Sequence, residues 1–289
     1  MENLEKFYIN GRWVTPNSTE TMPVSNPATE QKIGRITLGN GTDVDRAVTA
    51  ALTAFEEFSQ TSKAQRLSLL LRLKSVTEAR FEDLAQAMRL EMGAPISMAR
   101  SDQADAAVGH LQGFIDALEK LEEQITLASG DVLVREPIGV CGLITPWNWP
   151  MNQIVLKVVP ALATGSCCIL KPSEHTPISA MIYAEIIDEA GYPPGVFNLV
   201  NGDGPTVGAA LSRHADIQMM SFTGSTRAGI AVTQDAAPTV KRVTLELGGK
   251  SPNLVFADCD LENQITASVQ ECMFKASRVN FESTGFSLA

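Results

Sequence analysis

Apolar residues recur at helical spacing through most of the first 125 residues of the chain. This periodicity predicts four successive helices: one with Thr42 as its N-cap, one from Ser62, one over residues 84–92 and one over residues 96–125. Gly93-Ala94-Pro95 separates the last two, because glycine and proline end helices. We interpret the apolar stripes of these helices as core rather than as cofactor contacts.

Two short aromatic or β-branched runs mark a different element at the start of the chain. Residues 7–14 read F-Y-I-N-G-R-W-V, with two aromatic or β-branched runs around Asn10-Gly11. An Asn-Gly pair in such a setting is typical of a β-hairpin with a type I′ turn. The chain is therefore expected to begin with a hairpin that precedes the helices.

From residue 131 onward, short apolar runs alternate with helical patterns. Strands are expected at residues 131–144, 166–170, 196–200, 219–222 and 240–247, and helices at residues 179–190, 206–212 and 226–236. Pro137 argues against a central strand in the first half of 131–144, because proline cannot donate to a ladder. The β-α-β rhythm predicts an α/β fold with an open, mostly parallel sheet and helices on both faces. Such sheets bind ligands at the carboxyl ends of their strands.

Composition narrows the classes of function. The chain has 289 residues and a net charge of -10, which disfavours nucleic acid and anionic membranes as partners. No apolar run is long enough to span a bilayer, and the first residues lack the features of a signal peptide. The five cysteines are scattered and odd in number, which is typical of a reducing cytoplasm. The three histidines show no metal-ligand spacing.

Glu246 is the first candidate for chemistry. It lies in T-L-E-L-G-G-K-S-P, residues 244–252, where an apolar alternation ends in Gly248-Gly249. This pattern predicts a buried strand followed by a glycine turn. A carboxylate at the end of such a strand is expected to be partly desolvated, which raises its pKa and suits a general base. The structural alternative is a strand-end glutamate that pairs with Lys250.

Asn148 is the second candidate. It stands between Trp147 and Trp149, in a loop with proline on either side. The prolines fix the loop and the aromatic rings exclude water, so the amide could donate a hydrogen bond to a developing oxyanion. An ordinary turn asparagine fits the same residues.

Three further motifs follow apolar strands. Lys171 and Glu174 could bind ribose hydroxyls, or could form a solvated surface ion pair. The glycine-rich turn at residues 202–208 and the F-T-G-S-T run at residues 222–226 both lead into helices. A helix N-terminus with glycine nearby favours a phosphate, although each stretch alone is also compatible with a plain loop. Neither stretch has the G-x-G-x-x-G spacing.

Taken together, these motifs resemble those of the aldehyde dehydrogenase superfamily. The matching stretches are P-W-N-W-P at 146–150, K-P-S-E at 171–174, F-T-G-S at 222–225 and E-L-G-G-K-S-P at 246–252. They occur in the family's order, and the resemblance runs from about Phe7 to Phe274. It implies a Rossmann-like coenzyme domain and NAD(P)-dependent oxidation of an aldehyde to a carboxylic acid.

The resemblance also assigns roles to residues. It implies that Glu246 is the general base and that Asn148 stabilises the tetrahedral intermediate. It implies cofactor contacts from Ile144, Thr145, Pro146, Trp147, Lys171, Ser173, Glu174, Gly204, Gly208, Phe222, Gly224, Ser225 and Leu247. Lys171 and Glu174 would hold the adenosine ribose, and Ser225 the pyrophosphate. The charge of Glu174 favours NAD over NADP, although related members use both.

For the organisation of the chain, the resemblance implies three parts. Residues 1–247 are expected to form the coenzyme-binding domain, residues 248–274 the start of a catalytic domain, and residues 275–289 a divergent tail. A strand at about residues 131–137 is expected to pair with another subunit, since the full-length family forms homo-oligomers. The residues do not identify the aldehyde.

The resemblance breaks where the family carries its nucleophile, in an N-x-G-Q-x-C element. Residues 275–278 stand where N-x-G-Q is expected, and Asn280 stands where the cysteine is expected. The remaining thiols are poor replacements: Cys272 is expected in a helix over residues 265–274, Cys259 lies between two aspartates, and Cys167-Cys168 enter a core strand.

Two accounts of this break are open, and we favour the first. The tail from Lys275 is an out-of-frame or alternatively ended product of a normal gene, or the chain is a genuine short paralogue. In either case we expect little or no turnover and an exposed apolar surface. The alternative function is a catalytically inactive cofactor-binding or regulatory fragment that associates with full-length subunits. A hydrolase that uses Glu246 alone is a third hypothesis.

Overall fold

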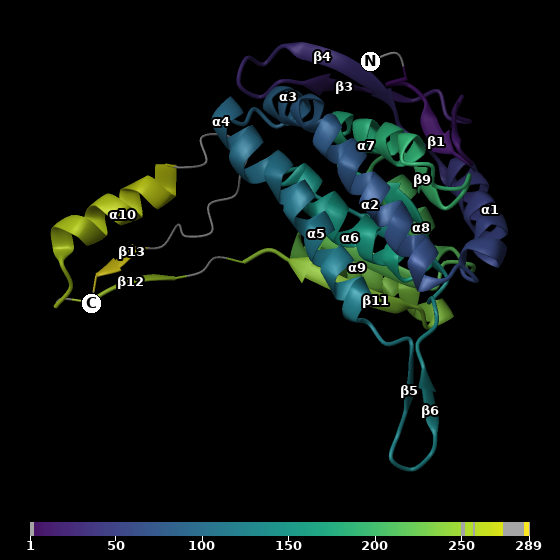
Figure 1. Ribbon diagram of the computed structural model, residues 1–289. Coiled ribbons are helices and arrows are strands. Elements are labelled where there is room, and N and C mark those ends of the chain that lie inside the picture. Colours follow the sequence, from purple (N-terminus) through teal and green to yellow (C-terminus); the bar gives the residue numbers. More distant parts are fainter. Residues whose placement is uncertain (1–2, 250–251, 257, 274–285, 289) are drawn as a thin grey trace.

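A seven-stranded sheet organises the protein, with strand order β11-β10-β7-β8-β9-β1-β2 (Figure 1). The computed structural model describes residues 3–249, 252–256, 258–273 and 286–288. The parallel strands are β7 (Val140–Ile144), β8 (Cys167–Lys171), β9 (Phe197–Leu199), β10 (Met219–Gly224) and β11 (Arg242–Leu247). Strands β1 (Phe7–Ile9) and β2 (Arg12–Val14) continue the sheet in antiparallel pairing. The expected open, mostly parallel α/β sheet is therefore confirmed.

The N-terminal hairpin forms as predicted. Asn10 and Gly11 have φ angles of 53° and 72°, so both turn residues are in the left-handed region that a type I′ turn requires. Tyr8 pairs with Trp13 across the hairpin, and their rings meet edge to face at 5.5 Å. The hairpin completes one edge of the main sheet.

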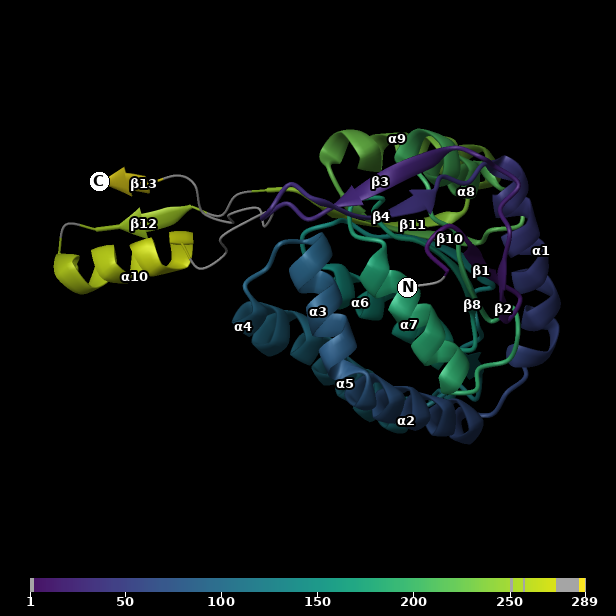
Figure 2. The same cartoon turned by 90° about the horizontal axis from the view of Figure 1, so that it is seen from above.

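Helices cover both faces of the sheet (Figure 2). Helices α6 (Pro150–Ala163) and α7 (Ile178–Glu189) pack on one face. A second layer covers them: α2 (Lys63–Ala79), α3 (Phe81–Glu91) and α5 (Asp105–Lys120). The opposite face carries α1 (Gly41–Phe58), α8 (Ala209–Arg213) and α9 (Thr226–Ala236). The main core lies between the sheet and these layers.

Several predicted boundaries are wrong by a few residues. The N-cap of α1 is Asn40, not Thr42: its side chain accepts from the Asp43 amide, and the Asp43 carboxylate accepts from the Asn40 amide. The third helix begins at Phe81 rather than at residue 84. Its end at Glu91, before the left-handed Gly93, agrees with the sequence.

The fourth predicted helix is shorter than expected and is interrupted. It comprises α4 (Ile96–Met98), a π-helical segment (Ala99–Ala104) and α5, and it ends at Lys120. Residue 125 lies instead in β5 (Gln124–Thr126), which pairs antiparallel with β6 (Val132–Val134). Lys63 ends α5 by donating to the Glu119 and Leu121 carbonyls at 3.2 and 3.0 Å. Because Lys63 lies far earlier in the sequence, the apolar periodicity of residues 96–125 could not indicate where this helix ends.

Some elements were not predicted, among them α6 and the strands β3 (Thr21–Ser25) and β4 (Lys32–Thr37). Helix α6 is buried almost all round, so its sequence has no polar face to reveal the helical period. Strands β3 and β4 form a second antiparallel hairpin near α3.

The last described elements lie apart from the main sheet in both views (Figures 1 and 2). Strand β12 (Asn253–Val255) pairs in parallel with β13 (Phe286–Leu288), and helix α10 spans Leu261–Met273. The predicted helix over residues 265–274 is thus longer at its start, while Phe274 falls outside the described residues. Within the described part of the chain, every helix is too short or too polar to cross a membrane.

Candidate functional site

The connections of the sheet reverse direction between β7 and β10. Helices α6 and α7 follow β7 and β8 onto one face, whereas α8 and α9 flank β10 on the other. A crevice opens at such a switch point, at the carboxyl ends of the two strands. Ile144 ends β7 and is the register partner of Phe222 in β10. The fold therefore places two predicted cofactor contacts side by side where a ligand is expected.

A cavity of about 470 Å³ lies beside this point. Four predicted residues line it together: Ile144, Gly204, Gly208 and Phe222. The turn at Gly204–Gly208 and helices α8 and α9 supply the rest of the wall, which sequence reasoning missed: Pro205, Ala209, Ser212, Arg213, Arg227, Ala228, Ala231, Val232 and Asp235. A repeat of small and apolar residues along α9 is the only signal in the sequence, and it also fits an ordinary packed helix. The cavity is mainly apolar with a few charged groups at its rim.

Lys171 lies next to Gly208 of the cavity wall and is buried. Its Nζ donates to the carbonyls of Pro172 at 2.9 Å and Gly202 at 2.6 Å, and it meets the Glu174 carboxylate at 3.3 Å. Burial lowers the pKa of Lys171, and the neighbouring Glu174 opposes that shift. The alternative of a solvated surface ion pair is therefore wrong for Lys171, which is 3% exposed.

The residues around Lys171 connect it to the strand ends. The Thr145 amide donates to the Lys171 carbonyl at 3.2 Å, which joins the ends of β7 and β8. Ser173 is buried and accepts from the His175 amide through its Oγ at 3.3 Å. A Cβ added to Gly208 would stand 3.6 Å from Ile144 and 3.9 Å from Lys171, so the lysine stem reaches the cavity wall.

Two helix starts face the same edge of the sheet. Asp203 caps the turn at Gly204–Gly208 by accepting from the Thr206 amide at 2.7 Å. Ser225 caps α9 by accepting from the Ala228 amide at 3.3 Å. A Cβ built on Gly204 meets nothing within 4 Å, so a ligand can approach this backbone closely. We expected the run F-T-G to follow the strand, but it forms the last three residues of β10.

The loop with Asn148 connects the end of β7 to the start of α6. Pro146, Trp147 and Asn148 are partly buried, and Trp149 packs against the main core. Pro150 occupies the first turn of α6, where its missing N–H costs nothing. Asn148 therefore sits on a loop that is fixed at both ends by regular structure.

Glu246 lies at the same edge of the sheet but is not buried. It is the register partner of Thr223 in β10, and Leu247 is that of Gly224. Strand β11 is the first in the sheet order, and its side chains alternate between partly buried and exposed. The prediction of a buried strand with a desolvated Glu246 is therefore wrong. Edge position is a property of the tertiary fold that the apolar alternation does not reveal. Leu247 packs instead on the start of α9, with its Cδ2 2.6 Å from the point where a Gly229 Cβ would stand.

The desolvated charge near Glu246 is Lys157, which sequence reasoning missed. This residue of α6 is 7% exposed and donates to Ser221 Oγ at 3.0 Å. Burial lowers its pKa to about 8, opposed by the charge of Glu246. A lone cation in an otherwise apolar helix was the available signal.

The thiols of the core are poor nucleophiles. Burial raises the pKa of both Cys141 and Cys167 to about 12, and that of Cys168 well above its ordinary value. Cys259 is only partly buried. Cys272 belongs to α10. Among the residues that the structure describes, no three potential ligands gather to hold a metal ion.

A comparison with known protein families shows which family has this sequence. The sequence profile of the "Aldehyde dehydrogenase family" matches residues 13–279. The chain belongs to the aldehyde dehydrogenase family. It is 50% identical over 279 residues to the 3-succinoylsemialdehyde-pyridine dehydrogenase of a Pseudomonas species, which is 96% of this chain and 58% of that relative. The chain thus spans little more than half the length of the curated relatives it matches.

Solved aldehyde dehydrogenases share the fold. The enzyme from Bartonella henselae superimposes with a TM-score of 0.90 at 47% identity, over 93% of this chain and 57% of that one. The C291A mutant of aldehyde dehydrogenase C from Pseudomonas syringae, crystallised with NAD+ and octanal, gives 0.91 at 50% identity, over 94% and 56%. These matches confirm the Rossmann-like aldehyde dehydrogenase fold.

Proposed function

We propose that this chain is the coenzyme-binding part of an NAD(P)-dependent aldehyde dehydrogenase. The observation that carries the proposal is the cavity at the β7–β10 switch point, with buried Lys171 beside it. Relatives crystallised with NAD+ support it. In this proposal residues 1–247 form the coenzyme-binding domain, residues 248–274 begin a catalytic domain and residues 275–289 are a divergent tail.

The residues present fit a dinucleotide. The apolar wall formed by Phe222, Ala231 and Val232 would take the adenine ring. Lys171 and Glu174 would hold the ribose hydroxyls, and the open backbone at Gly204 and the start of α9 at Ser225 would face the phosphates. The remaining expected contacts, Thr145, Pro146, Trp147, Ser173, Gly208, Gly224 and Leu247, lie at the same edge of the sheet. The charge of Glu174 would disfavour a 2′-phosphate, which favours NAD.

The bound coenzyme would supply the hydride acceptor. The proposed roles of the protein are those of positioning and proton transfer: the Asn148 amide donates to the oxyanion, and the Glu246 carboxylate takes a proton from water. The thiolate that attacks the aldehyde has no counterpart in an N-x-G-Q-x-C element of this sequence. We therefore propose that this chain binds coenzyme with little or no aldehyde oxidation.

A second candidate function follows from the β5–β6 hairpin. Its strand β6 exposes three apolar side chains, Val132, Leu133 and Val134, which are 57%, 41% and 50% exposed. An exposed apolar strand favours pairing with another chain. We propose that a chain without turnover can still associate with a second aldehyde dehydrogenase subunit through this strand.

Calorimetric titration with NAD and with NADP tests the coenzyme proposal. We expect heat of binding with NAD, weaker binding with NADP, and loss of both in Lys171→Met. Lys74→Met is the matched control, because Lys74 also pairs with a glutamate close to it in sequence, Glu78, but lies on α2. An absence of heat with either nucleotide at about millimolar concentration would overturn the proposal.

A further inference from the structure

The β5–β6 hairpin projects from the body of the protein as an arm, which we define as residues 122–137 (Figure 1). None of the residues 122–136 is buried. The two strands pair with each other through Gln124–Val134, Ile125–Leu133 and Thr126–Val132. Because the arm has no core of its own, its direction relative to the body must be set at its root.

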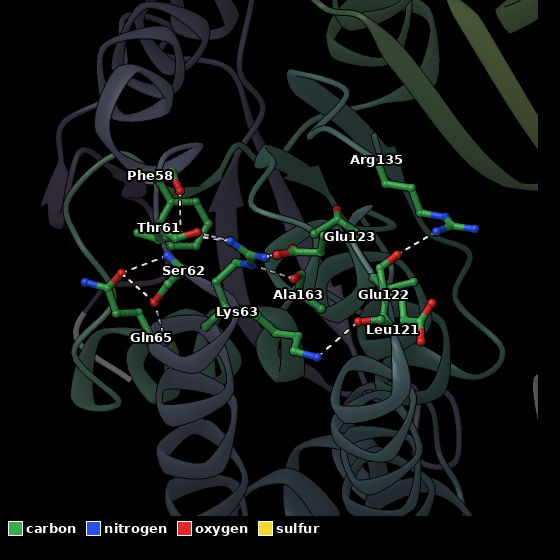
Figure 3. Close-up of polar contacts among 12 residues, drawn as sticks. Phe58, Thr61, Ser62, Lys63, Gln65, Leu121, Glu122, Glu123, Arg135 and Ala163 are labelled. Atoms are coloured by element: carbon green, nitrogen blue, oxygen red, sulfur yellow. Dashed lines mark hydrogen bonds and ion pairs between the residues drawn. The ribbon is translucent and has the colours of Figure 1, made fainter. Parts of the chain in front are cut away.

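One buried guanidinium lies at that root. Arg66, in the first turn of α2, is 3% exposed, and its Nε donates to the Ala163 carbonyl at 2.9 Å. Its Nη1 donates to the Thr61 carbonyl, and its Nη2 to the Glu123 carboxylate. Figure 3 shows Thr61, Ala163 and Glu123 converging from three separate segments. All three guanidinium nitrogens are therefore used, each on a different part of the fold.

Neighbouring cations fix the strand that leaves the body. Lys63, one turn before Arg66 on α2, donates to the Leu121 carbonyl at the end of α5 (Figure 3). Arg135 donates to the Glu122 carbonyl through its side chain, and its backbone amide donates to the Glu123 carbonyl at 2.9 Å. The outgoing strand is thus held against both α2 and the returning strand.

The returning strand enters the body near the same side chain. A Cβ added to Gly165 would stand 3.0 Å from the Pro137 ring and 3.7 Å from the Arg66 Cδ. Pro137 and the Arg66 stem therefore lie close together around Gly165. Both strands of the arm enter the body within reach of one side chain.

We propose that Arg66 is the positioning residue of the arm, which holds the arm in one direction relative to the sheet. A planar guanidinium satisfies three acceptors in fixed directions, whereas a lysine ammonium at the same depth cannot reproduce that fork. Arg66 is buried while Glu123 is only partly buried, so removing the carboxylate would leave the guanidinium without its charged partner, and we expect the root of the arm to open. The consequence for assembly rests on the proposed function of the arm, but the positioning role does not.

Double electron–electron resonance, which measures the distance between two spin labels, tests this role in the whole chain. Labels at Glu56→Cys on α1 and Ala128→Cys near the arm tip, in a Cys259→Ser, Cys272→Ser background, report the direction of the arm. Excess unlabelled chain removes distances between subunits. We expect a narrow distance distribution in the parent, which becomes at least about twofold broader in Arg66→Lys and less so in Glu123→Gln.

Arg72→Lys is the matched control. Arg72 lies on the same helix and also donates its Nε to a carbonyl, that of Ala190 at 3.0 Å, but away from the arm. It should leave the distribution unchanged. If Arg66→Lys fails to fold, Glu123→Gln alone decides. A parental distribution in every folded variant at the root would overturn the proposal. The measurement needs neither coenzyme nor partner. Its result therefore tests the role of Arg66 even if the chain proves not to bind coenzyme or a second subunit.

Discussion

Lys157 donates from its Nζ to the Oγ of Ser221 across 3.0 Å, and this bond ties the middle of α6 to strand β10. The ammonium lies under the sheet edge that carries Glu246, whose charge opposes the effect of burial on Lys157. A neutral hydroxyl compensates only part of the cost of burying a cation. The chain therefore keeps a charged group close to its proposed active site at the expense of stability.

This burial predicts a pH-dependent stability. The pKa of Lys157 falls from 10.5 to about 8 on folding, so the unfolded state binds more protons between these values. Stability should rise as pH goes from 8 to 10.5, by up to about 3 kcal/mol, and Lys157→Met should remove this rise. Urea unfolding at several pH values measures it, with Lys74→Met as the control. An unchanged slope in Lys157→Met would contradict the assignment.

Glu91 predicts a slope of opposite sign in a lower pH window. It is fully buried and accepts from the Ile178 and Ser179 amides at the start of α7. Burial raises its pKa to about 7, against the effect of those bonds. The folded state then binds more protons between pH 4.5 and 7, so stability should fall as pH rises through this window, by roughly 2–3 kcal/mol.

Glu91→Gln resembles the protonated side chain in shape and cannot ionise. We expect it to match the parent near pH 4.5 and to be the more stable protein at pH 8. Glu56→Gln, on the exposed side of α1, should keep the parental slope. The idea fails if Glu91→Gln and Glu56→Gln unfold with the same pH profile.

Two glycines with positive φ allow packing to be separated from backbone strain. A Cβ at Gly195 (φ +85°) would stand 2.5 Å from the Ala50 carbonyl oxygen, whereas a Cβ at Gly130 (φ +90°) meets nothing within 4 Å. Gly130→Ala should cost about 1–2 kcal/mol from the left-handed backbone alone. Gly195→Ala should cost clearly more, because α1 must also move. If the two variants shift the urea midpoint equally, α1 moves away from the added Cβ at no cost and the expectation is contradicted.

Val240 predicts a stabilising substitution. It has φ 52° and ψ 28°, a conformation that is costly for a β-branched residue, and it is 90% exposed. Val240→Gly should raise the free energy of unfolding by about 1 kcal/mol, since relief of the Cβ clash exceeds the added chain entropy. Val240→Ala, which keeps the Cβ, should gain less. Thermal unfolding compares the three proteins, and a loss of stability in Val240→Gly would refute the expectation.

Local signals predicted those elements that local contacts determine. Helix α9 spans the predicted residues 226–236 because Ser225, next to it in sequence, caps its start. The hairpin turn at Asn10-Gly11 is likewise set by the two residues themselves. The cavity residues Ile144 and Phe222 could be placed together because both lie near the carboxyl ends of neighbouring parallel strands.

Contacts distant in sequence account for the misses. The end of α5 depends on Lys63, and the exposure of Glu246 depends on β11 being an edge strand. Helix α6 was missed because burial on nearly all sides leaves no polar face in its sequence pattern. Lys157 was missed with it. Apolar periodicity predicts an element from the contrast between its buried and exposed faces. It therefore gives no signal for a helix that is buried on nearly all sides, and it does not show whether a strand has one neighbour or two.

The contacts of Arg66 also have a consequence for chain entropy. The segment from Pro137 to Ala163 leaves the neighbourhood of Arg66 along β7, turns at the loop with Asn148 and returns along α6 to the carbonyl that Arg66 binds. Its two ends therefore lie close together beside Arg66, as do the ends of a polymer loop that is closed at its base. Closure at the base restricts where the apex can go, even before any neighbour packs against it. The contacts of Arg66 with Ala163 and Glu123, at the opposite end of the sheet, therefore help to determine the position of the loop with Asn148.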